Sequence, residues 1–217
     1  TGNCMFLPIG VLNKEGTWTG LAINWIVVYI GNFIGSIFVA FCLAYWAGLI
    51  NTTPWAIWAV SNVANTKAGL DFMTAFLRGI GCNWLVCLAV WLALSADDVI
   101  GKIFSCWFPI MAFVTTGFEH SVANMFFLPA GWFVANDPLG IVPAATKAAL
   151  TSDMTSNIMG MNGWYNILIG NLLPVTLGNI VGGAVFVSLI YWYVYLRTPL
   201  VKVKVGDAPK AAATPAK

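Results

Sequence analysis

Four stretches of this chain are long and apolar enough to cross a lipid bilayer, and this feature limits its fold more than any other. They cover residues 20–50, 69–94, 103–134 and 164–196. A helix that spans the hydrocarbon core needs about 20 mostly apolar residues. Charged residues make up only 8% of the chain, against about 25% in a typical soluble domain. The sequence therefore predicts an all-α polytopic membrane protein, with residues 1–12 as the end of a further span.

Composition and motifs argue against several classes of function. The net charge of +2 is small and scattered, which argues against a nucleic-acid partner. The sequence contains no phosphate-binding glycine loop, dinucleotide motif or metal-ligand cluster. Its five cysteines lack C-x-x-C spacing, and most lie in apolar runs where cysteine acts as a small hydrophobic residue. We therefore expect neither an enzyme nor a cofactor or metal site, and membrane lipid as a partner.

The distribution of basic residues predicts the orientation. Cytoplasmic loops of membrane proteins carry an excess of Lys and Arg. One side of the membrane would hold seven basic residues, Arg197 included, in the links at 13–17 and 95–102 and the tail from 198. The other side would hold two, Lys67 and Lys147. We therefore predict a multi-pass protein of the cell (inner or plasma) membrane with a cytoplasmic C-terminus. Residues 198–217, rich in Lys, Ala and Pro, are predicted to form a disordered tail.

An internal repeat gives the most information about architecture. Residues 3–10 and 124–131 both fit N-x-x-F-L-P-x-G. The spans that follow share the spacing N-x6-G-N-x2-G, which starts at Asn24 in one and at Asn171 in the other. The two copies begin an odd number of spans apart, so they should have opposite orientations, as in many transporters and channels.

The repeat predicts a channel domain over residues 1–197, with 1–50 as the remnant of the first half and 69–197 as the second half. The 69–94 span has no counterpart in the first half. We therefore expect the equivalent helix to precede Thr1 in a six-helix, three-plus-three protein. The alternative is a chain with five native spans, which would leave one wall open to lipid.

Polar residues interrupt the third span near its middle. Residues 117–124 read G-F-E-H-S-V-A-N, a poor sequence for a membrane helix. Irregular backbone at membrane depth is tolerated only against protein or a water-filled cavity. A broken helix would present N–H groups and a positive dipole end to a solute, which suits an anion. By the repeat, Asn3 and Asn124 are predicted to cap two such half-helices.

Three polar side chains are candidates for contact with a solute, each with an alternative, and a fourth, Glu119, is expected to be structural. His120, the only histidine, lies at membrane depth, where ionisable residues usually mark a pathway, or it is a structural residue that links helices. Glu119 would repel an anion, so we expect it to pair with a neighbouring helix or with backbone N–H groups. Asn83 could offer its amide to a solute or bind two helices together. Lys67 could attract anions at an outer mouth or be an ordinary loop lysine.

The string G-F-E-H-S-V-A-N-M at 117–125 resembles the formate/nitrite transporter family. Further matches are T-G-N at 1–3, N-W-L-V-C-L-A-V-W at 83–91 and L-P-V-T-L-G-N-I-V-G-G at 173–183, so that the resemblance covers nearly all of 1–197. It implies an aquaporin-like fold and a homopentamer with one pore per subunit. It also implies transport of formate, nitrite, hydrosulfide or lactate, often with a proton.

The resemblance also implies roles for particular residues. His120 would be the central pore histidine, Thr1 would face it from the loop that breaks another helix, and Lys67 would lie in a vestibule. The remaining positions that match pore-lining or constricting residues of the family are Asn83, Val86, Phe113 and Asn179. The segment before Thr1, which supplies part of the constriction in the family, is absent from this sequence.

Both lines of argument favour a channel or secondary transporter for a small monovalent anion, formate or nitrite first, that is proton-coupled or gated by pH. Hydrosulfide or lactate is the alternative cargo within the family. An aquaporin-like pore for neutral solutes is a weaker rival, because Asn3-Cys4 and Asn124-Met125 stand where that family has Asn-Pro-Ala. A membrane anchor of an oxidoreductase is a rival of another class, disfavoured by the single histidine.

Overall fold

The computed structural model describes residues 1–197, and every regular element within them is a helix. The predicted disordered tail, 198–217, lies outside the described residues. Besides α-helices, several elements have the wider turns of a π-helix and are labelled η. In chain order the elements are α1 (Asn3–Leu12), α2 (Trp18–Phe38), η1 (Val39–Trp46), α3 (Trp55–Ile57), η2 (Trp58–Asn65), α4 (Thr66–Ala68), α5 (Phe72–Ser95), α6 (Val99–Thr115), α7 (Ser121–Asn136), α8 (Ala144–Ala149), α9 (Ser152–Thr155), α10 (Gly160–Tyr165), η3 (Asn166–Leu172), α11 (Leu173–Gly183), η4 (Ala184–Leu189) and η5 (Trp192–Leu196).

The long helices follow three of the predicted spans. Helices over Trp18–Trp46, Phe72–Ser95 and Gly160–Leu196 are long and apolar enough to cross a membrane. Capping side chains begin two of them, since Thr17 accepts a hydrogen bond from the Gly20 N–H and Asp71 accepts one from the Thr74 N–H. The predicted 103–134 span consists of two helices, α6 and α7, separated at 116–120. The prediction of a broken helix there is confirmed.

One helical segment lies outside the predicted spans. The stretch between the spans predicted at 20–50 and 69–94 holds three short helical pieces, α3, η2 and α4, and most of the apolar side chains of η2 are buried. This segment packs closely on α7: a methyl group on Gly131 would overlap the Ala64 side chain and lie 2.9 Å from the Ala59 carbonyl oxygen. The segment is too short to cross the bilayer, so apolar length alone does not identify it.

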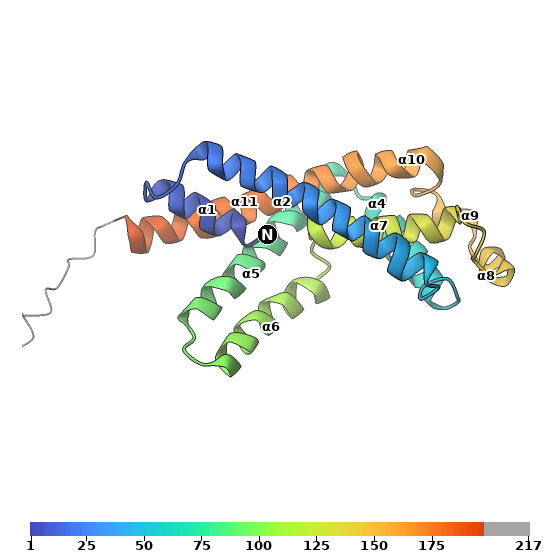
Figure 1. Ribbon diagram of the computed structural model, residues 1–217, viewed down its shortest axis with the longest axis horizontal. Coiled ribbons are helices and arrows are strands. Elements are labelled where there is room, and N and C mark those ends of the chain that lie inside the picture. The colour runs from blue at the N-terminus through green and yellow to red at the C-terminus, as the bar shows by residue number, and fades with distance from the viewer. Residues whose placement is uncertain (198–217) are drawn as a thin grey trace, which may run out of the picture.

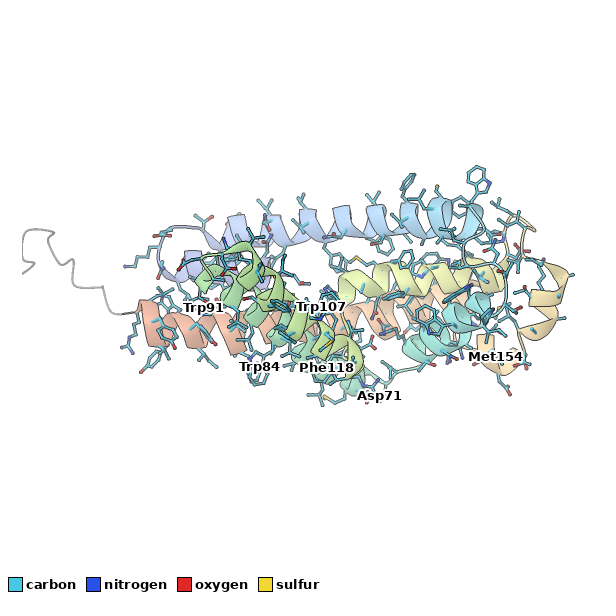
Figure 2. The ribbon with its side chains drawn as sticks, turned by 90° about the horizontal axis from the view of Figure 1, so that it is seen from below. Asp71, Trp84, Trp91, Trp107, Phe118 and Met154 are labelled. Atoms are coloured by element: carbon cyan, nitrogen blue, oxygen red, sulfur yellow. The ribbon has the colours of Figure 1, made fainter. Side chains whose placement is uncertain are left out.

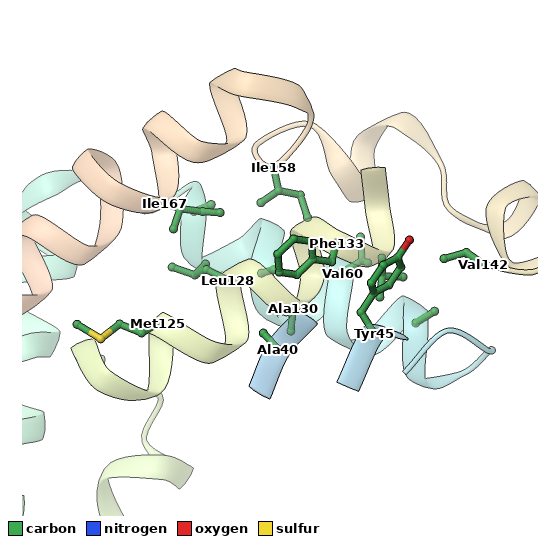
Figure 3. Close-up of a cluster of buried hydrophobic side chains, with 14 of the residues drawn as sticks. Ala40, Tyr45, Val60, Met125, Leu128, Ala130, Phe133, Val142, Ile158 and Ile167 are labelled. Atoms are coloured by element: carbon green, nitrogen blue, oxygen red, sulfur yellow. The ribbon is translucent and has the colours of Figure 1, made fainter. Parts of the chain in front are cut away.

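The largest buried cluster surrounds α7 (Figure 3). Met125, Leu128 and Phe133 extend from α7 toward side chains of η1, η2 and η3. The Phe133 ring lies edge-on to Phe41 with a centroid distance of 5.0 Å. This cluster fixes α7, and with it the helix break that precedes α7.

The two copies of the repeat form the same contact. The Asn3 amide donates to Oδ1 of Asn24 at 2.9 Å, and the Asn124 amide donates to Oδ1 of Asn171 at 2.8 Å. The Thr176 hydroxyl also lies 3.4 Å from the hydroxyl of Tyr29, and these two residues follow Asn171 and Asn24 by the same five positions. A contact between equivalent positions is typical of a two-fold axis. Inversion about an axis in the membrane plane stays a prediction.

Figure 1 shows an elongated body in which α1, α2, α7 and α10–α11 run roughly along the long axis. Helices α5 and α6 form a hairpin that projects from the side of this body. The hairpin meets the body close to the break between α6 and α7, where the N-terminal residue also lies.

Candidate functional site

The break between α6 and α7 organises the site. Helix α6 has 17 residues and α7 has 16, so the break lies near the middle of the span they form together. Gly117 has a φ of +72°, in the left-handed region that glycine adopts without steric cost. The Glu119 N–H donates to the Arg78 carbonyl oxygen at 3.3 Å, which ties the break to α5.

His120 is the N-cap of α7 and uses its two ring nitrogens differently. Nδ1 accepts a hydrogen bond from the Val122 N–H at 3.2 Å, while Nε2 lies 3.5 Å from the Thr1 hydroxyl. Because Nδ1 accepts, the ring hydrogen of the neutral tautomer is assigned to Nε2. A second proton would have to displace the Val122 bond, next to the positive end of the α7 dipole. The site therefore favours a neutral imidazole that offers Nε2–H.

An apolar cluster adjoins this histidine. Val86, Phe113 and Cys82 are buried together between α5 and α6, with Leu85 and Phe118 at the edge. The Phe113 ring centroid lies 5.8 Å from that of His120. The structure thus places four predicted pathway residues in one chain of contacts, Val86 to Phe113 to His120 to Thr1.

The amide of Asn179 holds the break in place. Its Oδ1 accepts from the Ser121 N–H at 2.9 Å, and its Nδ2 donates to the carbonyl oxygens of Gly79 at 2.8 Å and Glu119 at 3.0 Å. The side chain is buried, and each of its polar atoms is occupied. The Asn179 side chain therefore holds the helix break against α5 and leaves no free amide N–H for a solute.

Asn83 is fully buried and also joins segments. Its Nδ2 donates to the Asn179 carbonyl oxygen at 2.7 Å and lies 3.4 Å from the Thr1 carbonyl oxygen, and its Oδ1 is 3.7 Å from the Cys87 thiol. The geometry favours the helix-linking interpretation of Asn83.

Lys67 forms an ion pair, a contact that neither sequence-based interpretation of this residue included. Its ammonium lies 2.7 Å from Oε1 of Glu119, whose side chain is only 2% exposed. The other carboxylate oxygen accepts from Asn124 at 2.6 Å and lies 3.5 Å from Asn171. The expectation that Glu119 pairs with neighbouring helices is confirmed. The sequence did not predict Asn171 as a site residue. The repeat offered a signal, because it makes Asn171 equivalent to Asn24 and both follow a conspicuous N-x-x-F-L-P-x-G motif.

The predicted capping roles of Asn3 and Asn124 are wrong. Gly2 is the N-cap residue of α1 and forms no side-chain cap bond, and the cap of α7 is His120. Both asparagines lie inside their helices and donate sideways, to Asn24 and Asn171. Protein groups also occupy the Ser121 and Val122 N–H groups, so the start of α7 offers a solute fewer free donors than the sequence predicted.

A cavity of about 530 Å³ lies beside the break, between α2 and the η3–α11 segment. Thr1, Ser121 and Asn179 belong to its wall. Much of the rest of the wall consists of pairs equivalent by the repeat, namely Ala22 with Ile169, Ile26 with Leu173, Tyr29 with Thr176 and Asn32 with Asn179. The cavity thus lies between the two halves.

Comparison with known proteins gives consistent results. The family model described as formate/nitrite transporter matches residues 1–193. A probable formate transporter of Methanothermobacter thermautotrophicus is 44% identical over 91% of the chain, and the chain spans 68% of it. The formate channel FocA of Escherichia coli K12 is 37% identical over 83% of the chain, 61% of its own length. The nitrite transporter NirC of the same strain is 35% identical over 95% of the chain, 66% of its own length.

Two solved structures share the fold. A structure described as a pentameric formate channel with formate bound superposes with a TM-score of 0.69 at 36% identity, covering 82% of this chain and 68% of that one. A structure described as an FNT family ion channel gives a TM-score of 0.67 at 32% identity, covering 91% and 68%. These values confirm the predicted membrane-channel fold.

Proposed function

The chain belongs to the formate/nitrite transporter family, a family of transport proteins rather than enzymes, and on that premise we propose that it conducts a small monovalent anion together with a proton. Formate and nitrite are the first candidates, since relatives bear those names. Hydrosulfide or lactate is the alternative cargo. The observation that carries the proposal is the contact chain from Val86 through Phe113 and His120 to Thr1.

The proposed mechanism follows from a difference in polarity: Val86 and Phe113 form an apolar end of these contacts, and His120 and Thr1 form a polar end. A bare anion is costly between Val86 and Phe113, which are buried and apolar. A weak acid lowers that cost by taking a proton, because a low dielectric favours its neutral form. His120 contributes an Nε2–H donor aimed toward Thr1, which orients the acid at the entrance of the apolar segment. In this proposal the proton comes from water in the vestibule, and His120 stays neutral.

The other predicted residues are proposed to support the pathway. Asn179 and Asn83 hold the break against α5 and Thr1, while Lys67 neutralises Glu119. We further propose residues 1–197 as the channel domain, a homopentamer in a lipid membrane, and a cytoplasmic C-terminus. The pentameric formate channel that shares the fold supports the assembly, and the excess of basic residues supports the orientation.

A liposome uptake panel tests the function. The purified protein is reconstituted and presented with formate, nitrite, lactate, hydrosulfide and glycerol at pH 5 to 8. We expect formate or nitrite flux above that of empty liposomes, increasing as the pH falls. Val86→Trp should reduce this flux at least tenfold by filling the apolar segment. Val194→Trp, at a 61% exposed position near the end of the last helix, is the matched control and should not.

Glycerol uptake without anion uptake would identify a neutral-solute pore instead. Flux that equals that of empty liposomes for every solute would refute the proposal.

A further inference from the structure

Three sulfur-containing side chains gather where α1 meets α5, apart from the contacts of the proposed pathway. Cys4 and Met5 belong to the first turn of α1, and Cys87 belongs to α5. Met5 and Cys87 are fully buried in one cluster, and Cys4 is also buried. We call Cys4, Met5 and Cys87 the sulfur cluster.

The absence of a side chain on Gly183 lets the two thiols approach each other. A Cβ atom added to Gly183 would lie 2.6 Å from Cβ of Cys4 and 3.0 Å from Sγ of Cys87. These two atoms are therefore no farther apart than the sum of the two distances. Metal–thiolate bonds are about 2.3 Å long, so one ion can join sulfur atoms about 4.6 Å apart. Rotation of the Cys4 side chain about its Cα–Cβ bond can set this separation.

The donor atoms of the sulfur cluster are chemically soft. Thiolate and thioether ligands select copper(I) among the common metal ions, whereas calcium and magnesium require several oxygen ligands. A structural zinc site needs four ligands, and the described residues contain no group of three or more His, Cys, Asp or Glu side chains that could hold a metal ion. The donor set therefore favours a soft monovalent ion with a low coordination number.

Asn83 links the sulfur cluster to the proposed pathway. Its Oδ1 lies 3.7 Å from Sγ of Cys87, and its Nδ2 lies 3.4 Å from the Thr1 carbonyl oxygen. A ligand that draws Cys87 toward Cys4 would therefore act on the amide that contacts Thr1.

The surroundings shield the sulfur cluster on one side and offer an entry on the other. Trp91, labelled in Figure 2, packs against the cluster, and its ring lies edge-on to Tyr191 with a centroid distance of 4.7 Å. Cys4 and Thr1 both belong to the wall of the cavity of about 530 Å³ between the two halves. An ion in that cavity would reach Cys4 first and Cys87 behind it.

We propose that Cys4 and Cys87, with Met5 as a third donor, form a binding site for copper(I), and that the bound ion lowers anion flux by fixing α1 against α5. Each thiol that binds loses its proton to water as a copper–sulfur bond replaces the S–H bond. Copper stays in the same oxidation state, so no oxidant is needed. The sequence predicted no metal site, because the two cysteines lie far apart in it. The site is independent of the proposed function, whereas its effect on flux rests on that function.

Silver(I) is the probe for binding, because it shares the preference of copper(I) for sulfur and is stable in air. The full chain carries Cys42→Ser and Cys106→Ser in every sample, so that the less buried thiols do not compete, and we call this protein the parent. We expect one silver ion per parent chain by elemental mass spectrometry after desalting. Competition with a soluble thiol chelator gives the affinity.

Serine variants identify the ligands. Cys4→Ser and Cys87→Ser should each weaken silver binding at least a hundredfold, since a hydroxyl of similar size replaces the thiolate, and Met5→Leu should weaken it about tenfold. Cys82→Ser is the matched control, because Cys82 is another buried thiol of α5, and it should change the affinity less than twofold. Binding by Cys4→Ser or Cys87→Ser as tight as by the parent would overturn the site.

X-ray absorption of the parent loaded with copper(I) decides the question if a serine variant fails to fold. We expect sulfur atoms as the only neighbours of copper. Oxygen or nitrogen neighbours, or a parent that takes up no metal, would refute the site.

Formate flux in chloride-free liposomes measures the effect of the bound ion. One equivalent of silver should lower the flux of the parent at least fivefold and that of Cys4→Ser less than twofold. Unchanged flux in the silver-loaded parent, or equal inhibition of both proteins, would overturn the effect on transport. A parent that shows no flux without silver would refute the proposed function, and the silver content would still decide the metal site.

Discussion

The two ring nitrogens of His120 form different contacts in this structure. Nδ1 closes the first turn of α7 through the Val122 N–H, and Nε2 faces Thr1. Titration between pH 5 and 8 would need a proton on Nδ1 and would break that turn. On the proposed function, this arrangement favours a pH dependence that comes from the cargo, with His120 as a neutral hydrogen-bond donor instead of the relay or gate expected from the sequence.

We expect His120→Asn to keep the shape of the flux–pH curve between pH 5 and 8 within about twofold, in the range where a free histidine titrates. The asparagine carbonyl can accept from the Val122 N–H, so α7 should begin at the same residue. Total flux should fall, because the Asn amide is too short to reach as far as Nε2. The measurement is liposome flux against pH for both proteins. A flat curve for the variant would show that His120 is the titrating group.

His120→Leu serves as the control for the structural role. It has no acceptor for the Val122 N–H and should lose about 1 kcal/mol of stability, as for other lost helix caps.

The pair of Lys67 and Glu119 leads to a second prediction. Lys67→Met leaves a carboxylate that is 2% exposed without its cation, which typically costs about 3–5 kcal/mol. Adding Glu119→Gln should restore most of that stability, because the double variant buries no unpaired charge. Thermal unfolding of the two single variants and the double variant forms the test. Additive losses would mean that the two side chains are not coupled.

Ionic strength provides an independent check on the same pair. An exposed cation at a vestibule mouth would act over about 8–10 Å and be screened by salt. Since Glu119 neutralises Lys67 in the structure, Lys67→Met should change the anion flux by a similar factor at low and at high salt.

Whole elements differ in how well the sequence specifies them. The long spans and the break at 116–120 could be predicted, because apolar length and a polar run inside it are local signals. The helical segment at 55–68 could not, because it is too short to span and is stabilised by α7, a segment far away in the sequence. The Lys67–Glu119 pair could not be predicted either, because its members lie 52 positions apart. The repeat identified Asn124 as an important position, but its amide binds Asn171 and does not cap α7.

The glycines of the repeat give a matched test at this scale. A methyl group on Gly178 would overlap the Phe76 carbonyl and lie 3.0 Å from Cα of Gly79, whereas nothing among the described residues lies within 4 Å of the equivalent position on Gly31. Gly178→Ala should therefore cost about 1–3 kcal/mol through overpacking. In this chain Gly31→Ala should be neutral or stabilise by up to about 1 kcal/mol, the helix preference of alanine over glycine.

Thermal unfolding of both glycine variants in one detergent measures these effects. Equal destabilisation would mean that the Gly31 face is covered as closely as the Gly178 face, by a neighbouring copy or another helix. Within residues 1–197, Gly178 and Gly182 of the second half pack closely on α5, whereas the equivalent Gly31 and Gly35 of the first half have no corresponding neighbour.

At the scale of the whole molecule, the proposed pathway lies within a single chain. Val86 and Phe113 belong to one buried cluster. The Phe113 ring lies against the His120 ring, and His120 in turn faces the Thr1 hydroxyl. On the proposed function, each subunit should therefore conduct by itself, in contrast to a channel whose single pore is shared by all subunits.

Mixed oligomers test that separation. Subunits blocked by Val86→Trp are co-expressed in varying ratio with unmodified subunits, and flux is measured against the blocked fraction in purified pentamers. With one pathway per chain, flux should fall linearly, to about one half when half of the subunits are blocked. A single pore shared by five subunits would leave about 3%, one half to the fifth power, in a symmetric pentamer. Pentamers built only from Val86→Trp subunits control for assembly and should remain intact, because Val86 is buried between α5 and α6 within one subunit. A steep curve with intact pentamers would contradict the pathway through His120 and move it to the common axis.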